Sequence, residues 1–165
     1  MTTQDPNLIA ATTSDQPILE AVTEDPGATR VSHLEVIETV IASLQENDSA
    51  MISESDNGSL WRFQYGSVEV FVQLTGDSED DLFVVWSPIL SLPVKDELGL
   101  MRRLLEMNWT DTFEACFAIA NDEVLVLVQR SVNELSPGEV ARAITLVATV
   151  ADENDEALIE EFNPG

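Results

Sequence analysis

The side chains that most often act as nucleophiles and bases are few in this sequence and do not pair. The chain has one cysteine, Cys116, and one histidine, His33. A nucleophilic Cys or Ser needs a base beside it, and no pattern in the sequence places His33 there. We expect Cys116 to be a small buried residue in a strand and His33 to be a solvated residue in the first turn of a helix. The sequence therefore predicts no catalytic residue and a protein that is not an enzyme.

The densest acidic cluster lies in a predicted turn. Carboxylate oxygens at such close spacing could hold Ca²⁺ or Mg²⁺. The run lacks the spaced ligands and the distal bidentate glutamate of an EF-hand loop, and we interpret it as a solvated hairpin turn. No cofactor is expected, and the candidate metal ligands are Asp77, Glu79, Asp80 and Asp81.

The charge of the chain narrows the choice of partner. Thirty-one acidic residues stand against 7 basic ones, a formal net charge of −24. Such a surface repels phosphate backbones and anionic lipids, so neither nucleic acid nor a membrane is an expected partner. The acidity serves either solubility or the binding of a basic protein partner. The candidate contacts for a basic partner are Glu160 and Glu161, close to the C-terminus.

A row of aromatic residues offers a second candidate contact site. Trp61, Phe63 and Tyr65 alternate with polar residues and therefore share one face of a predicted strand. If helices cover only the opposite face of the sheet, the row is an exposed apolar patch for a protein partner. If the row faces the helices, it belongs to the core. Alternation alone cannot decide between these two alternatives.

Helices with capping boxes are expected at both ends of the folded region. Ser32 and Glu35 form a capping box ahead of an apolar repeat, which predicts a helix over about 32–47. Ser136 and Glu139 form a second box, with proline at the first helical position. Both helices should therefore begin at these serines.

Another helix is expected over about 95–108. Side chains three or four residues apart lie on one face of a helix. We expect its buried side to consist of Leu98, Met101, Leu104, Leu105 and Met107.

Alternating apolar residues and tight turns predict an antiparallel sheet. Asn57-Gly58 and Asn121-Asp122 are dipeptides typical of two-residue hairpins, which place neighbouring strands antiparallel. The last strand is apolar on both faces, which indicates a covered position inside the sheet. The fold class is therefore α+β, with three helices and five or six strands in the order α-β(3–4)-α-β-β-α. The expected strands are a short one that begins at 51–52 and ends at the turn 56–58, and longer ones at 59–65, 68–74, 82–86, 113–120 and 123–131.

Residues 1–30 differ in composition from the remainder. They are rich in Thr, Asp, Pro and Ala without sustained periodicity, which predicts a flexible or loosely docked arm. We expect residues 31–165 to form a single α+β domain. The first residues lack the basic and apolar regions of a signal peptide, and no stretch approaches the ~18 apolar residues of a membrane span. The expected location is the cytoplasm.

Three motifs in the second half of the chain resemble one known family. They are LLEMN (104–108), FEACFAIANDEVLVLVQR (113–130) and LSPGEVARAITLVATVAD (135–152). Together they resemble the YbjN family in its cyanobacterial type, whose fold is similar to that of the type III secretion chaperones. The secretion-chaperone pattern has three strands before the second helix, whereas this sequence has four candidates. Segment 50–55 is therefore either an added edge strand or an extended arm.

The resemblance implies a function, although it supplies no catalytic residues. The family is described as sensory-transduction regulators, and its chaperone-like relatives bind partner proteins, frequently as dimers. It implies a non-enzymatic protein-binding module, chaperone-like or regulatory, that forms a homodimer. The alternative is a small-molecule or divalent-metal-dependent enzyme or sensor that uses surface carboxylates such as those at 77–81.

Overall fold

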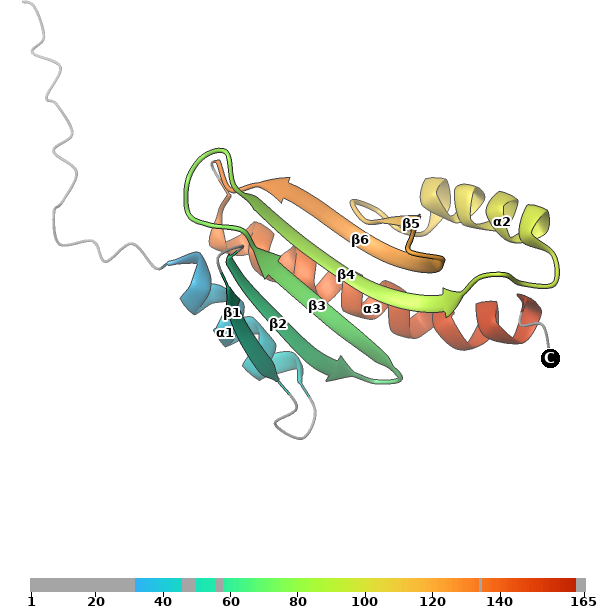
Figure 1. The fold of residues 1–165 in the computed structure, drawn as a ribbon, viewed down its shortest axis with the longest axis horizontal. Helices are drawn as coiled ribbons and strands as arrows, with labels where there is room; N and C mark the ends of the chain where they lie inside the picture. Colours follow the sequence, from blue (N-terminus) through green and yellow to red (C-terminus); the bar gives the residue numbers. More distant parts are fainter. Residues whose placement is uncertain (1–31, 46–49, 56–57, 134, 163–165) are drawn as a thin grey trace, which may run out of the picture. The chain divides into compact units, whose positions relative to one another are not determined.

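The computed structural model describes residues 32–45, 50–55, 58–133 and 135–162. The expected arm over residues 1–30 lies outside the described residues. Within the described part, helices and strands follow in the predicted order (Figure 1). They are α1 (His33–Leu44), β1 (Met51–Ser55), β2 (Gly58–Tyr65), β3 (Val68–Leu74), β4 (Leu82–Ser91), α2 (Glu97–Thr110), β5 (Cys116–Ala120), β6 (Glu123–Ser131) and α3 (Pro137–Phe162).

The strands of the described residues form one antiparallel sheet in the order β1-β2-β3-β4-β6-β5. The predicted α+β class with three helices is thereby confirmed. Residues 51–55 pair with β2, from Met51 opposite Arg62 to Ser55 opposite Gly58. This segment is therefore an added edge strand and not an extended arm. Strand β6 lies inside the sheet, between β4 and β5, as its apolar sequence indicates.

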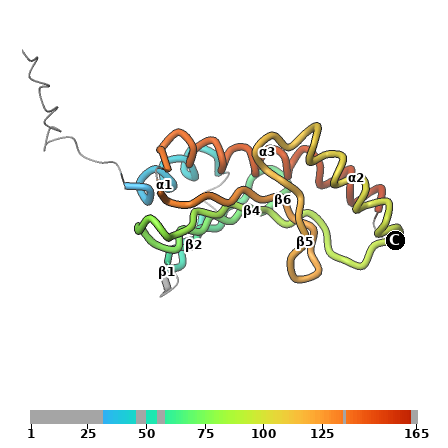
Figure 2. The backbone as a smooth tube through the Cα atoms, turned by 90° about the horizontal axis from the view of Figure 1, so that it is seen from above, coloured from blue at the N-terminus to red at the C-terminus, as the bar shows by residue number. Residues whose placement is uncertain are grey.

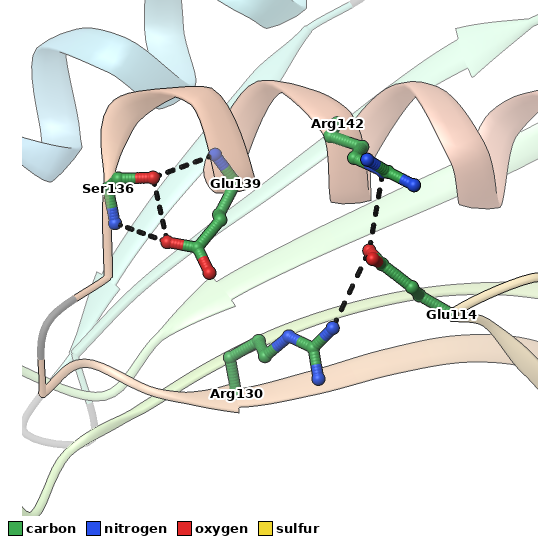
Figure 3. A network of polar contacts seen from close by, with 5 residues as sticks. All are labelled: Glu114, Arg130, Ser136, Glu139 and Arg142. Atoms are coloured by element: carbon green, nitrogen blue, oxygen red, sulfur yellow. Dashed lines mark hydrogen bonds and ion pairs between the residues drawn. The ribbon is translucent and has the colours of Figure 1, made fainter.

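Both predicted capping boxes are present. The Ser32 hydroxyl accepts a hydrogen bond from the Glu35 amide at 3.2 Å, and the Glu35 carboxylate accepts one from the Ser32 amide. Ser136 and Glu139 make the same reciprocal pair at the start of α3 (Figure 3), at 3.2 and 2.8 Å. These bonds satisfy amides that have no partner inside the helix, which explains why both helices begin there.

The core lies between one face of the sheet and the helices α1 and α3 (Figures 1 and 2), and it includes the buried side chains of α2. Along β3 and β4 every second side chain is buried and the ones between are half-buried. The buried set points toward the helices, where it meets the apolar side of the 26-residue helix α3. The largest fully buried side chains are Trp61, Phe63, Phe83, Ile37, Ile41, Leu100 and Ile144.

The turn between β2 and β3 is fastened to α3. Gly66 has a φ of 51°, and its backbone lies so close to Asp152 that a Cβ atom would clash with the carboxylate. The Ser67 hydroxyl lies 3.0 Å from an Asp152 oxygen and 2.8 Å from an oxygen of Asp155, whose side chain is buried. The single proton of the Ser67 hydroxyl is therefore shared between two carboxylates at this junction.

Two strand boundaries differ from the sequence-based expectation. Strand β4 continues through Pro88 to Ser91, because a register shift between Pro88 and Leu90 accommodates the proline in the ladder. Strand β5 begins at Cys116 and not at residue 113. Phe113 has a positive φ of 54°, which breaks the extended backbone ahead of the strand.

Candidate functional site

The single cysteine and the single histidine have environments that differ from those expected. Cys116 is exposed and not buried, because β5 is an edge strand and Cys116 pairs with Leu127 on the face away from α1 and α3. His33 is half-buried and not solvated, and its Nε2 lies 2.7 Å from the carbonyl oxygen of Leu135. The histidine ring thus connects the first turn of α1 to the segment that precedes α3.

The acidic cluster at 77–81 closes its own turn. The Asp81 carboxylate accepts hydrogen bonds from the Ser78 hydroxyl at 2.6 Å, the Thr75 hydroxyl at 2.8 Å and the Ser78 amide at 3.0 Å. These bonds, that of the Ser78 hydroxyl above all, hold the pKa of Asp81 below its ordinary value. Asp77, Glu79 and Asp80 are exposed. Across the described ranges, no group of three or more His, Cys, Asp or Glu side chains is arranged to hold a metal ion.

The aromatic row lies on the helix-facing side of the sheet. Trp61 and Phe63 are each 1% exposed and belong to the core, and Tyr65 is half-buried at its edge. Their proposed role as partner contacts is therefore corrected for Trp61 and Phe63, which no partner can reach. Trp61, Phe63 and Tyr65 share one face of β2, as their alternation predicts. The positions of α1 and α3 decide that this face is the buried one.

Helix α2 is apolar on two opposite sides. The side chains that it buries are Leu100, Leu104 and Met107. Leu98 and Leu105, which were expected to be buried, are 80% and 70% exposed. At 100° per residue they lie on the far side of the helix from Leu100 and Leu104. The prediction for these two residues is wrong because the sequence offers two apolar sides and packing buries only one.

The exposed side of α2 continues to its end. Trp109 follows Leu105 by four residues and is 90% exposed, and Phe113 in the next turn is 82% exposed. We name the exposed residues Leu98, Leu105 and Trp109, together with Met101 at their border, the α2 stripe. Met101 is half-buried and also packs against the core. Trp109 was not among the predicted contact residues, although its spacing from Leu105 is the sequence signal that could have found it.

An open hollow of about 900 Å³ runs along the α2 stripe, and all of its lining residues come from α2 and Asp111. Its charged residues are Arg102, Arg103, Glu106 and Asp111, two of each sign, in a chain whose net charge is −24. Within the described residues, Arg102 and Arg103 have no ion-pair partner. The hollow is thus apolar, locally neutral and walled by a single helix.

Two exposed ion pairs connect Glu114, in the segment between α2 and β5, to β6 and α3 (Figure 3). The Glu114 carboxylate lies 3.5 Å from Arg130 on β6 and 3.4 Å from Arg142 on α3. Each of the three side chains is at least 42% exposed, so each pair contributes little to stability. Close by, hydrogen bonds from the Ser136 hydroxyl and amide hold the pKa of Glu139 below its ordinary value.

The two C-terminal candidates for a basic partner lie in the last turn of α3. Glu160 and Glu161 are both exposed. The last turn of α3 contains no basic residue, so their charge is unopposed within that turn. They remain accessible to a partner of opposite charge.

Comparison with known proteins assigns most of the chain to one family. The model of the YbjN family, described as "Putative bacterial sensory transduction regulator", matches residues 33–160. No curated protein matches the chain. The described helices include none with the length and apolar character needed to cross a membrane.

Proposed function

Because the chain belongs to the YbjN family, we propose that it is a non-enzymatic regulatory or chaperone-like module that binds proteins and pairs with a second copy of itself through the α2 stripe. The family description supports a regulatory or binding role. The observation that carries the proposal is the exposed apolar side of α2. Exposed apolar surface of this extent commonly marks a protein-interaction site. The cytoplasmic location expected from the sequence is part of the same proposal.

Local charge supports a second copy as the occupant of the α2 stripe. Two chains that each carry −24 repel one another unless they meet where the surface is neutral. The hollow along α2 meets that condition with two basic and two acidic residues. In a two-fold symmetric contact, residue i of one copy meets residue j of the other and the reverse. Arg102 and Arg103 can therefore meet Glu106 and Asp111 of the second copy.

The size of the exposed surface supports a dimer of moderate affinity. Burial of the α2 stripe and Phe113 would remove on the order of 500 Å² per protomer from water, below the roughly 800 Å² of a standard interface. The hollow is lined by α2 and Asp111 alone, and in a dimer the α2 helix of the second copy would line its other side. We therefore expect a dimer at micromolar protein concentration.

The acidic surface supports a basic protein as the further partner. Glu160 and Glu161 are exposed at the end of α3. Long-range electrostatic attraction between these carboxylates and a basic protein raises the rate of association and weakens as salt is added. The metal-dependent alternative rested on the carboxylates at 77–81. The Asp81 carboxylate accepts hydrogen bonds from the hydroxyls and the amide of its own turn. We therefore prefer the protein-binding proposal to the metal-dependent alternative.

The proposal is tested by light scattering after size exclusion. The wild-type chain should show about twice the protomer mass of 18.1 kDa, and the double variant Leu105→Gln/Trp109→Gln should show the protomer mass. Leu34→Gln, which changes an exposed leucine on α1, is the matched control and should remain dimeric. A wild-type chain that is monomeric at micromolar concentration would contradict the proposal, as would a double variant that stays dimeric.

A further inference from the structure

The sheet has a second face that points away from α1 and α3, and it is also apolar. One row of directly paired residues crosses five strands on this face: Arg62, Phe71, Trp86, Leu127 and Cys116. Trp86 is central in the row and stacks on Phe71, with ring centroids 5.2 Å apart and planes 10° from parallel. Phe71, Trp86 and Leu127 are only half-buried. We name this surface the open sheet face.

The open sheet face is almost free of charge. Among the described strand residues that point to this side, the charged ones are Arg62, Glu69 and Glu123. Arg62 and Glu69 form an ion pair at 3.1 Å, and Glu123 lies at the end of the β5–β6 hairpin. The other polar residues that line its centre are the amides Gln73 and Gln129. In a chain with a net charge of −24, this face stands out as nearly neutral.

A hollow of about 370 Å³ occupies the part of this face formed by β4, β5 and β6. Val84, Trp86 and Leu127 line it together with the turn residue Asn121. Figure 2 shows the β5–β6 hairpin bending away from the side on which α3 lies, so the hairpin forms a raised border. The surface is therefore concave beside this hairpin.

The hydrogen bonding of the sheet limits what the hollow can accept. Strand β6 pairs with β4 and with β5, and β4 pairs with β6 along most of its length and with β3 over Phe83–Trp86. The backbone groups of these paired stretches are not free to bind another chain. An extended segment laid on this face would bury its own backbone N–H and C=O groups without partners, which is costly. An α-helix satisfies its backbone internally and offers an apolar side to the sheet. The occupant that fits is a helix.

We propose that the open sheet face is the docking site for an amphipathic α-helix of a partner protein, with an apolar contact side and basic flanks. The apolar side matches Trp86, Leu127 and Val84, where an acidic or basic side chain would be buried without a counter-charge. The basic flanks match Glu123 at the border and the negative field of the whole chain. This inference extends the proposed function from self-association to partner binding, and it uses a surface other than the α2 stripe.

The three tryptophans provide a separate reporter for each part of the molecule. Trp61 lies in the core, Trp86 on the open sheet face and Trp109 on the α2 stripe. Their indole N–H signals in a ¹⁵N–¹H spectrum can therefore be followed independently. Dilution of the protein alone should move the Trp109 signal if the α2 stripe forms the dimer. Dilution therefore tests the dimer of the proposed function. Titration with a peptide at fixed protein concentration tests the docking of a helix on the open sheet face.

The probe is a synthetic amphipathic peptide with leucine on its contact side and lysine on its flanks, titrated at physiological salt. The Trp86 signal should move, while the Trp61 and Trp109 signals remain in place. Leu127→Gln should weaken binding by about tenfold or more, with the Trp61 signal unchanged as evidence of an intact fold. Leu105→Gln on the α2 stripe is the matched control and should leave the peptide affinity unchanged.

Four results would overturn the inference. The first is a Trp86 signal that does not respond to the peptide. The second is a response of Trp109 in place of Trp86, which would assign the peptide to the α2 stripe. The third is equal binding of a peptide with serine on the contact side or glutamate on the flanks. The fourth is movement of the Trp86 signal on dilution of the protein alone, which would indicate a second copy on this face.

Discussion

Replacement of Trp109 by glutamine should separate the stability of the protomer from the stability of the dimer. The Trp109 side chain is 90% exposed in the protomer. A substitution at such a position changes the free energy of unfolding of the protomer by no more than about 0.5 kcal/mol. In a symmetric dimer the side chain is buried twice, and each burial of a large apolar side chain contributes roughly 1.5–3 kcal/mol. The Kd of the dimer should therefore rise by about a hundredfold to ten-thousandfold.

Thermal unfolding at a series of protein concentrations measures both quantities. Dimer formation stabilises only the folded chain, so the Tm of the wild type should rise with protein concentration. The Tm of Trp109→Gln should equal that of the wild type at the lowest concentration and should not rise. Leu34→Gln should keep the concentration dependence of the wild type, because Leu34 lies on α1.

Either of two results would refute this reasoning. If the wild-type Tm is constant over a hundredfold range of concentration, no dimer stabilises the chain. If Trp109→Gln lowers the Tm by several degrees at the lowest concentration, the side chain supports the protomer fold despite its exposure.

Three smaller perturbations address the turns and caps that hold these surfaces. Ser136→Ala should lower the free energy of unfolding by about 1 kcal/mol in urea denaturation, because the first turn of α3 loses its cap. The Glu139 pKa is lowered on folding, so the stabilisation from its ionised form is present above the ordinary glutamate range and lost as pH falls through the folded-state pKa. Ser136→Ala should flatten that pH dependence, and an unchanged profile would contradict the assignment. Ser67→Ala should cost about 1–3 kcal/mol, since it removes the donor to the buried Asp155 carboxylate, and a neutral effect in urea would contradict this. The Asp81 pKa is also lowered, so amide protection in its turn should fall with acidification in the wild type, whereas Asp81→Asn should lose that dependence.

The candidate surfaces show how packing selects among alternatives that the sequence leaves open. Helix α2 has one apolar side with Leu100 and Leu104 and another with Leu98 and Leu105, and both have helical spacing. The strand that contains Trp61 and Phe63 likewise has a defined shared face but no local sign of which face the helices cover. Each ambiguity is two-fold, and each is resolved by contacts with residues far away in the chain.

The order of elements, the capping boxes and the antiparallel hairpins were determined by the sequence itself, because each depends on residues at most a few positions apart. Ser136 and Glu139, for example, need only the first turn of their own helix to form their bonds. Tertiary structure alone decided that Trp109 and Trp86 lie on accessible surfaces while Trp61 is buried. The physical reason is that burial is set by which apolar sides meet when α1 and α3 pack on the sheet, and strand or helix periodicity specifies the sides without specifying their partners.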